Sequence, residues 1–448
     1  MTRRFHSKRT PGSMGVFTLM SEAKAAASAE AGDPVVDLSV GTPDMPPPAE
    51  ALDALRAAIE DPSAYKYCLR HGTMPLLTEA VAWYTRHYGL VDLDPATEAL
   101  SLVGSQEGLA HLLMAVADPG DGVLMCDVGY ACYLPAAHVA GVAPRFLPLR
   151  RDGSFLPDLA AAESAAAARS CKALLLNYPN NPTSAVADYG FWAEALAFCE
   201  EHDLLLINDN PYVAQVYSGD GLAASPLSLP GAKARTVELF SFAKSYQMGG
   251  CRLGFALGNA DAIAALEAVK APIDFNQFLG IQQMGIACLR LPQERLQVYT
   301  RMFCSRAAAL TAALREHAGW ATEMPKACMY VWTRLPDGFS DDTAFCLALV
   351  AATKVAVSPG SGFGPGGAGF VRFALVQPED VLVEAARKVG AFLASPAADE
   401  LRAADAAASA AAASSSAAAA SGAGAAGANA AANGIGPGQQ CEEVLAAL

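Results

Sequence analysis

The chain has 448 residues and a formal net charge of −14, and alanine contributes much of its 53% hydrophobic content. The acidity argues against nucleic acid or an anionic membrane surface as a partner, and no run of about 18 strongly apolar residues predicts a membrane-spanning helix. The eleven cysteines are scattered without a CxxC pair or a Cys/His ligand spacing, which favours free thiols in a reducing compartment over disulfides or a metal site.

The N-terminal residues, MTRRFHSKR, are basic but lack the apolar stretch of a secretory signal. We therefore expect a cytoplasmic protein, with an organelle stroma or matrix as the open alternative. A structured pattern begins by residue 14, so residues 1–13 are predicted to be an N-terminal extension.

Short apolar runs alternate with amphipathic helical stretches between residues 50 and 290. The predicted buried strands are 122–127, 172–178, 203–209, 236–242 and 252–257, and the clearest predicted helices are 107–117 and 190–202. From about residue 286 to 397 the pattern changes to helices with short strands such as MYVWTRL and FVRFALV. Together these patterns predict an α/β fold: a large domain with a mostly parallel sheet between helices, and a smaller α+β domain.

Three of the predicted strands run directly into polar residues, in LLLNYPNNPTS, LLLINDNPY and LFSFAKSY. In a doubly wound sheet the ligand site lies at the carboxyl ends of the strands. We therefore expect these polar groups to meet in one crevice.

The residue types at these strand ends suit a cofactor that carries both a phosphate and a cationic ring. Asp209 ends an apolar run, where a desolvated carboxylate needs a cationic partner. Residues 104–106 open a helix, whose free N–H groups suit a phosphate, and Ser241 and Arg252 add a hydroxyl and a guanidinium. With the amine of Lys244, this set predicts pyridoxal 5'-phosphate held as a Schiff base.

The order and spacing of these residues resemble the fold-type I class I and II aminotransferases, and most of all the LL-diaminopimelate aminotransferase branch. The resemblance covers roughly residues 14–396 and is carried by GSQEGLAHL, DPGD, YPNNPT, SFAKSYQMGGCRLGFALGN and KACMYVW. It implies a homodimer that moves an amino group between an amino acid and a 2-oxo acid. The implied donor is LL-diaminopimelate or a related dicarboxylic amino acid, with 2-oxoglutarate as acceptor.

The resemblance also implies a role for each matching residue in cofactor binding. Lys244 carries the cofactor and moves the substrate proton, and Asp209 pairs with the pyridinium nitrogen. Tyr212 and Asn181 hydrogen-bond the ring 3-oxygen, and Tyr130 stacks on the ring. The implied phosphate ligands are Ser105, Gln106, Ser241 and Arg252.

The resemblance further implies one residue that contacts the cofactor of the neighbouring subunit, and others that contact the substrate. Tyr67 reaches the phosphate from the neighbouring subunit. Arg372 grips the substrate α-carboxylate, assisted by Asn181 and by the backbone of Gly41. The sequence departs from the family pattern at several positions, including Ser184 in place of glycine. These departures affect the prediction of the substrate more than the prediction of the cofactor.

Two alternatives stay open at this point. A carbon–sulfur lyase or another elimination enzyme on the same scaffold would use the same cofactor residues, since both reactions pass through the same substrate carbanion. A non-catalytic regulator of this fold would normally carry a DNA-binding domain ahead of the match, where about a dozen residues stand here.

The resemblance also suggests how the chain divides. Residues 14–47 form an N-terminal arm that belongs to the small domain, and residues 48–285 form the large cofactor-binding domain. Residues 286–397 form the small C-terminal domain. Residues 398–448, nearly all Ala, Ser, Gly and Asn in their central part, are predicted to be a disordered tail because they offer little large apolar surface to bury.

Overall fold

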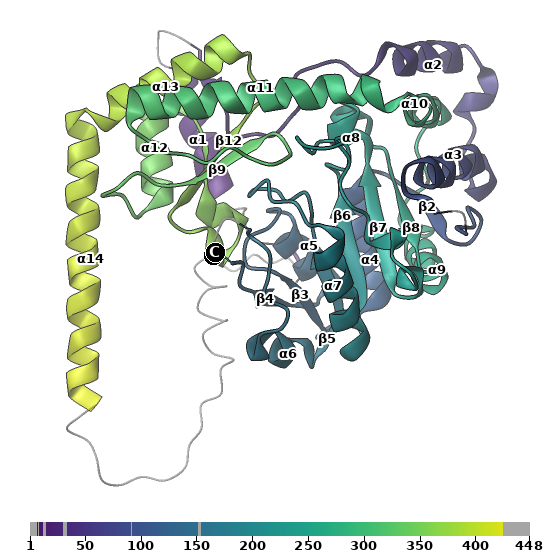
Figure 1. The fold of residues 1–448 in the computed structure, drawn as a ribbon, viewed down its shortest axis with the longest axis horizontal. Helices are drawn as coiled ribbons and strands as arrows, with labels where there is room; N and C mark the ends of the chain where they lie inside the picture. The colour runs from purple at the N-terminus through teal and green to yellow at the C-terminus, as the bar shows by residue number, and fades with distance from the viewer. Residues whose placement is uncertain are drawn as a thin grey trace.

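The protein contains a large part built on a seven-stranded sheet and a smaller part built on a three-stranded sheet (Figure 1). The computed structural model describes residues 7, 9–11, 15–29, 34–90, 92–150 and 154–423, so most of the predicted N-terminal extension lies outside the described residues. Within those ranges no helix is long and apolar enough to cross a bilayer. The helices are α1 Val16–Ala29, α2 Ala49–Ile59, α3 Arg70–Tyr88, α4 Ser105–Val116, α5 Tyr133–Ala140, α6 Ala162–Ala168, α7 Tyr189–Glu201, α8 Phe242–Ser245, α9 Ala260–Lys270, α10 Leu279–Leu289, α11 Gln293–Ala318, α12 Asp342–Thr353, α13 Glu379–Leu393 and α14 Pro396–Ala423.

The large sheet has the strand order β2-β8-β7-β6-β5-β3-β4. Its strands are β2 Ala99–Leu102, β3 Gly122–Cys126, β4 Ala143–Leu147, β5 Cys171–Leu176, β6 Leu205–Asn210, β7 Thr236–Ser241 and β8 Gly254–Gly258. Strands β3 to β7 pair in parallel, whereas β8 runs antiparallel to both β7 and β2. The predicted mostly parallel sheet is therefore confirmed, with β8 as its antiparallel exception.

Helices cover both faces of this sheet, which explains why the strands read as continuous apolar runs. One face packs against α4, α5 and α9 through residues such as Val237 and Leu239. The other face packs against α6 and α7 at one end and against α3 and α10 at the other. Strand β7 is buried over its whole length as a result.

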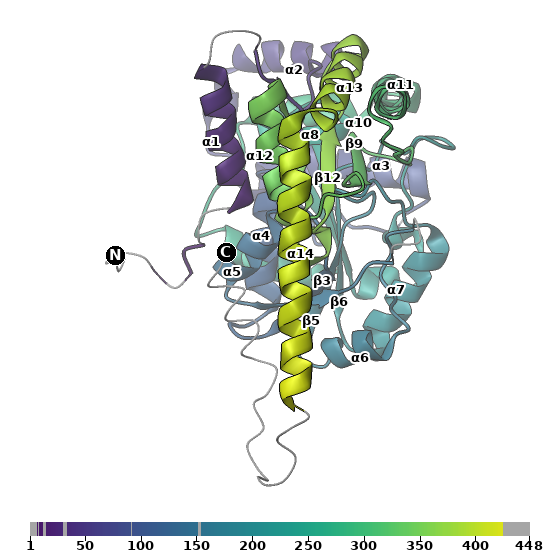
Figure 2. The ribbon, with the colours of Figure 1, turned by 90° about the vertical axis from the view of Figure 1, so that its left-hand side faces the viewer.

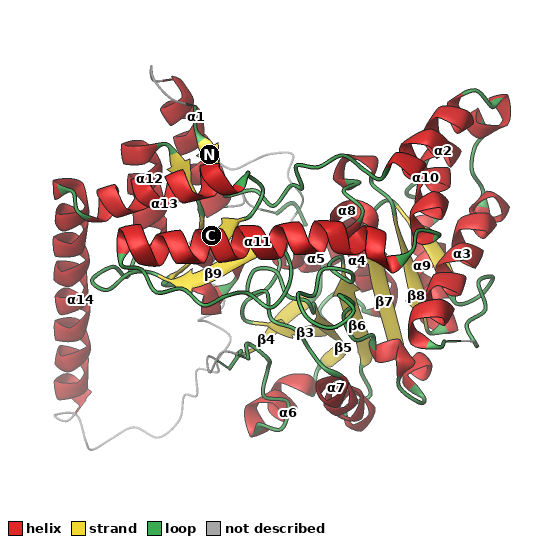
Figure 3. Cartoon of the chain, turned by 45° about the horizontal axis from the view of Figure 1, so that its top comes forward, coloured by secondary structure: helices red, strands yellow, loops and turns green. Residues whose placement is uncertain are grey.

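The smaller part is an α+β unit assembled from both ends of the chain. Its antiparallel sheet has the order β11-β12-β9, with strands β11 Ser358–Pro359, β12 Phe370–Ala374 and β9 Tyr330–Arg334. The short N-terminal strand β1, Val36–Asp37, pairs in parallel with β10, Val355–Ala356, and α1 packs on α12. The long helix α11 runs from the large part into the smaller one, where it packs along α13 (Figure 3).

Helix α14 occupies residues predicted from sequence to be disordered. The prediction placed a disordered tail at 398–448, but the structure is helical to Ala423, and residues 424–448 lie outside the described residues. Alanine is the strongest helix former, and the start of the helix is anchored. The Asp405 carboxylate accepts hydrogen bonds from the backbone N–H groups of Ser340 (2.6 Å) and Asp341 (3.2 Å), and Arg402 lies over the Phe339 ring. Beyond these contacts the helix extends past the smaller part (Figures 1 and 2).

Candidate active site

A cavity of about 560 Å³ lies at the carboxyl ends of β5, β6 and β7, between the two parts of the molecule. Both parts contribute to its walls, and eleven of the twelve residues predicted from sequence line it. These eleven are Gly41, Ser105, Gln106, Tyr130, Asn181, Asp209, Tyr212, Ser241, Lys244, Arg252 and Arg372. The expected convergence of strand ends on one crevice is confirmed.

Asp209 presents a buried carboxylate with one unpartnered oxygen. Its Oδ2 accepts a hydrogen bond from the Tyr133 hydroxyl at 2.8 Å, while Oδ1 has no hydrogen-bond partner among the described residues. Burial raises the pKa of this carboxyl from 3.8 to about 6, although the hydrogen bond from Tyr133 acts in the opposite direction. A buried acceptor in this state requires a donor from a ligand, and a protonated ring nitrogen fits it.

Lys244 extends into the same cavity from α8, which begins where β7 ends. Its Nζ donates a hydrogen bond to the main-chain oxygen of Gly41. Burial, together with the positive charges of Arg372 and Arg252, lowers the pKa of this amine from 10.5 to about 8. A substantial fraction of Lys244 is therefore neutral, and nucleophilic, near physiological pH.

A basic, donor-rich site surrounds the N-terminus of α4. Gly104 has φ +83°, and a Cβ atom there would lie 2.5 Å from Nη2 of Arg252, so glycine lets the guanidinium approach the helix end. Arg252 is itself in the left-handed region, at φ +52°, and Nη1 donates to the Gly249 carbonyl at 3.1 Å. Helix N–H groups beside a guanidinium and the hydroxyls of Ser105 and Ser241 fit a phosphate.

Tyrosines form the walls between the phosphate end and the smaller part. The Tyr130 hydroxyl donates to Oε1 of Gln106 at 3.2 Å, and its ring meets that of Tyr133 edge-on at 5.6 Å. The hydroxyls of Tyr212 and Tyr330 lie 2.8 Å apart in the buried floor of the cavity.

Arg372, on β12, is 5% exposed and lies between two aromatic rings, with Cζ 4.3 Å from the Tyr330 centroid and 4.6 Å from that of Phe363. Nη1 donates to Oδ1 of Asn181 at 2.8 Å, and Nη2 donates to the Ser39 carbonyl at 2.7 Å. Nε has no partner in the described part of the chain. The recorded acceptors are all neutral, so the guanidinium keeps an uncompensated charge that fits a substrate carboxylate.

Gly41 is needed for the close approach of two chain segments. A Cβ atom at this position would lie 2.2 Å from the Tyr330 hydroxyl oxygen, which is shorter than any real contact. The absence of a side chain therefore lets the Gly41 backbone reach both Tyr330 and the Lys244 amine.

Tyr67 lies outside the cavity, unlike the other predicted residues. Its side chain is 81% exposed, and its ring packs against Phe275 with centroids 5.0 Å apart. Within a single chain, Tyr67 is not positioned to contact a ligand in the cavity.

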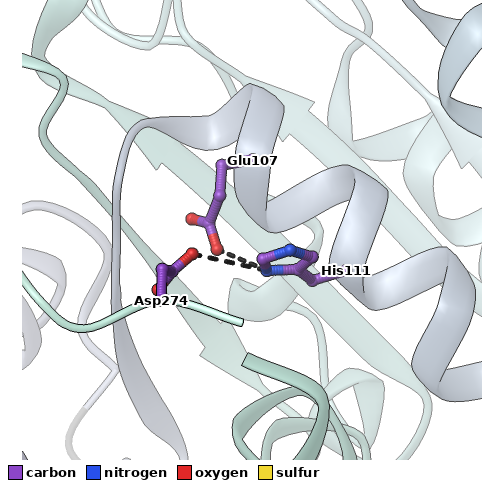
Figure 4. A group of neighbouring side chains, drawn as sticks. All are labelled: Glu107, His111 and Asp274. Carbon is purple, nitrogen blue, oxygen red and sulfur yellow. Dashed lines mark ion pairs between the residues drawn. The ribbon is translucent and has the colours of Figure 1, made fainter. Parts of the chain in front are cut away.

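A cluster of ionisable residues joins the same end of α4 to the C-terminal end of α9 (Figure 4). His111 Nδ1 lies 2.5 Å from Glu107 Oε1 and 3.9 Å from Asp274 Oδ2. These residue types can bind a metal, but the ammonium of Lys270 contacts Glu107 at 3.2 Å and also pairs with Asp274. The cluster thus contains its own cation. Oε2 of Glu107 also accepts a hydrogen bond from the Val103 N–H at 2.8 Å, so Glu107 holds the turn before α4 in place.

The cavity residues that were not predicted from the sequence include Phe17, Asn177, Tyr133 and Tyr330. Tyr133 had a usable signal, since it lies three residues after Tyr130 at the start of a helix. Asn177 donates from Nδ2 to the Asp209 carbonyl at 2.6 Å and accepts the Asn181 N–H at 2.9 Å, so it ties two predicted residues together.

Comparisons with known proteins agree with this geometry. The family model described as aminotransferase class I and II matches residues 33–389. An LL-diaminopimelate aminotransferase of Moorella thermoacetica is 39% identical over 82% of this chain and 93% of its own length, and LL-diaminopimelate aminotransferase 2 of Trichormus variabilis is 38% identical over 80% and 91%. A solved structure described as a probable N-succinyldiaminopimelate aminotransferase from Thermus thermophilus superposes with a TM-score of 0.80, at 50% identity, over 85% of this chain and all of that one.

Proposed function

The chain belongs to the class I and II aminotransferases, which use pyridoxal 5'-phosphate, and we propose that it transfers the amino group of a diaminopimelate-type amino acid to 2-oxoglutarate. The observation that carries the proposal is the cavity itself. It places a lysine of lowered pKa between an unpartnered buried carboxylate oxygen and an arginine whose recorded acceptors are neutral.

The residues present fit the cofactor. The unpartnered Oδ1 of Asp209 would accept the proton-bearing ring nitrogen, and Arg252 with the N-terminus of α4 would bind the phosphate. Tyr130 would cover the ring, and the Lys244 amine would hold the cofactor covalently. When bound, the cofactor accepts the electron pair left on the substrate α-carbon after proton removal.

The chain's own residues then supply positioning and proton transfer. Arg372 and Asn181 bind the substrate α-carboxylate and turn its Cα–H bond toward Lys244. The neutral Lys244 Nζ takes this proton, and the Gly41 carbonyl orients the amine. Asp209 keeps the proton on the ring nitrogen. Both substrates carry an α-carboxylate, so Arg372 serves each in turn.

Support for the substrate class comes from the relatives and from the outer cavity wall. The relatives' printed names share the diaminopimelate skeleton, with a free or an acylated distal amine. Phe17, Val40, Ala131 and Phe363 make part of the outer wall apolar, which suits a chain of methylene groups.

A panel of donors with 2-oxoglutarate tests this proposal. LL-diaminopimelate, its N-succinyl derivative, aspartate and phenylalanine would be compared by the glutamate formed. We expect one of the two diaminopimelate-type donors to give the highest kcat/KM. Preference for aspartate or phenylalanine would refute the substrate class. Product formation without a 2-oxo acid, with release of ammonia, would indicate elimination instead.

The active unit is a homodimer in this proposal, with Tyr67 reaching the phosphate site of its partner. Support comes from exposed apolar side chains grouped near Tyr67 in sequence and by ring contact: Tyr65, Leu69, Ile273 and Phe275. Mixing an inactive Lys244→Ala chain with a Tyr67→Phe chain should restore part of the activity, because one hybrid site then has both native groups. Full activity of a dilute monomer would contradict the shared site.

A further inference from the structure

A second buried carboxylate lies behind the cavity, on the opposite face of the sheet from Asp209. Glu238 in β7 is 0% exposed, and its Cα pairs in register with that of Asn208 in β6. Side chains alternate between the faces of a strand, so Glu238 shares a face with Asn208 and Asn210, while Asp209 points to the other. Core packing agrees, because Leu239 packs on the α4 side and Phe240 on the α3 side.

Four neutral groups donate hydrogen bonds to the Glu238 carboxylate. Oε1 accepts from the Tyr84 hydroxyl at 2.5 Å and from Nδ2 of Asn210 at 3.2 Å. Oε2 accepts from the Ser225 hydroxyl at 2.9 Å and from Nδ2 of Asn208 at 3.2 Å. The two asparagines on either side of Asp209 are therefore tied to the two oxygens of a single carboxylate.

The hydrogen bonds to Glu238 lie at the end of β6, where its pairing with β5 stops. Strand β5 pairs with β6 only as far as Leu176 opposite Asn208, so Asp209 and Asn210 extend beyond it on that side. Beyond that pair, the Asn177 side chain supplies a hydrogen bond in place of one between the strands, because it donates to the Asp209 carbonyl. On the other side, β7 pairs with β6 through Asn210. Glu238 adds the restraint on the face away from the cavity.

We propose that Glu238 is a positioning residue for the cofactor: by holding Asn208 and Asn210, it fixes the twist of the β6 end and so directs the unpartnered oxygen of Asp209 at the ring nitrogen. The inference rests on the proposed pairing of Asp209 with that nitrogen and does not depend on which amino acid is the substrate. A carboxylate suits this task because it accepts four bonds at once, which no neutral side chain of similar size does.

A purely structural role for Glu238 predicts a different outcome. The Tyr84 contact joins the sheet to α3, so loss of Glu238 would then loosen the whole region and weaken every ligand alike. If Glu238 acts through Asp209, its loss weakens only ligands that carry a ring nitrogen. Pyridoxal phosphate and its 1-deaza analogue, which has C–H in place of that nitrogen, separate the two cases.

The experiment measures dissociation constants of both compounds for the full-length apoprotein by absorbance titration. For Glu238→Gln, which keeps the size of the side chain, we expect about tenfold weaker binding of pyridoxal phosphate. Binding of the deaza analogue should change by less than about twofold. Thr236→Val is the matched control, since Thr236 is a fully buried polar residue on the same face of β7, and it should alter neither constant.

Asn210→Ala provides a second variant if Glu238→Gln fails to fold, and it should show the same selective loss to a smaller degree. Equal weakening of both compounds would overturn the inference in favour of a structural role, and so would unchanged binding of both. A wild-type protein that binds the two compounds equally well would instead contradict the Asp209 assignment within the proposed function. The two failures are thus distinguishable.

Discussion

Two largely buried lysines, Lys244 and Lys270, have opposite surroundings. Lys270, which is 4% exposed, pairs with the carboxylates of Glu107 and Asp274. Lys244 contacts a main-chain carbonyl instead, and the charged groups that lower its pKa are two arginines. Lys270 therefore has two anionic partners, whereas the surroundings of Lys244 favour a free amine.

The contrast shows that reactivity comes from what faces the amine and not from burial alone. Burial disfavours the charged form of any lysine, but a carboxylate partner reverses that effect and an arginine adds to it. Lys270 therefore joins α9 to α4 through its ion pairs, and Lys244 is suited to covalent and proton-transfer chemistry. Exchanging or removing the neighbours of either lysine tests this distinction.

Substitution of Lys244 should have the largest effect. Lys244→Ala is expected to lower kcat by at least about 10⁴-fold, because it removes both the covalent attachment and the proton-transfer group. Borohydride reduction of the wild-type holoenzyme followed by peptide mapping should place the label on Lys244. A label on Lys270 or any other lysine would contradict the assignment.

Arg372→Lys should come next, with a kcat/KM reduced by about 10²- to 10⁴-fold, or roughly 3–5 kcal/mol. Lysine keeps the charge but not the planar fork that orients a carboxylate. The visible absorption of bound cofactor should persist, which separates substrate binding from cofactor binding. Loss of the cofactor or unfolding would show that Arg372 is structural.

Lys270→Met should lower the free energy of unfolding by about 3 kcal/mol, because it leaves Glu107 and Asp274 without their cation. Urea unfolding of the apoprotein measures this loss. It should shrink as the pH falls, since protonation removes the unpaired negative charges. Lys172→Met, at an exposed position, is the matched control and should change the stability by less than about 0.5 kcal/mol. Loss of covalent cofactor capture in Lys270→Met would contradict the distinction between the two lysines.

The smallest expected effect is a shift in pH dependence. Covalent capture of the cofactor by the apoprotein requires neutral Lys244, so its rate should rise with pH through a midpoint near the pKa of about 8. Arg372→Gln removes one of the charges that lower this pKa, and should move the midpoint up by about 0.5–1 pH unit. Arg372→Lys keeps the charge and should leave the midpoint in place. A downward shift in the Gln variant would contradict the electrostatic explanation.

Strand ends were the most predictable part of the molecule. Apolar runs that end at or shortly before Asn181, Asp209 and Lys244 predict polar groups at one edge of a parallel sheet, and these three residues all line the cavity. Arg372 was identified by resemblance, but its position between two aromatic rings was not predicted, since Tyr330 and Phe363 reach it only through tertiary packing.

Other features could not be read from local sequence for related reasons. Glu238 looks like an ordinary strand residue, and its four donors come from three separate segments of the chain. Helix α14 was missed because low hydrophobicity was taken as disorder, although alanine needs little burial to be helical once Asp405 anchors the first turns. The role predicted for Tyr67 needs a second chain and stays a prediction.

The pairing of β1 with β10 has a consequence for synthesis on the ribosome. The Ser358 side chain donates to the Ser39 carbonyl across 319 residues of sequence, and β12 supplies the Arg372 that also binds this carbonyl. At translation rates of about 5–20 residues per second, the N-terminal arm waits on the order of half a minute for its partners to be made. During that interval the strands of the large sheet can already pair, while β1 and the neighbouring Gly41 still lack their partners from the C-terminal part of the chain. The catalytic cavity is therefore among the last features completed as the chain emerges.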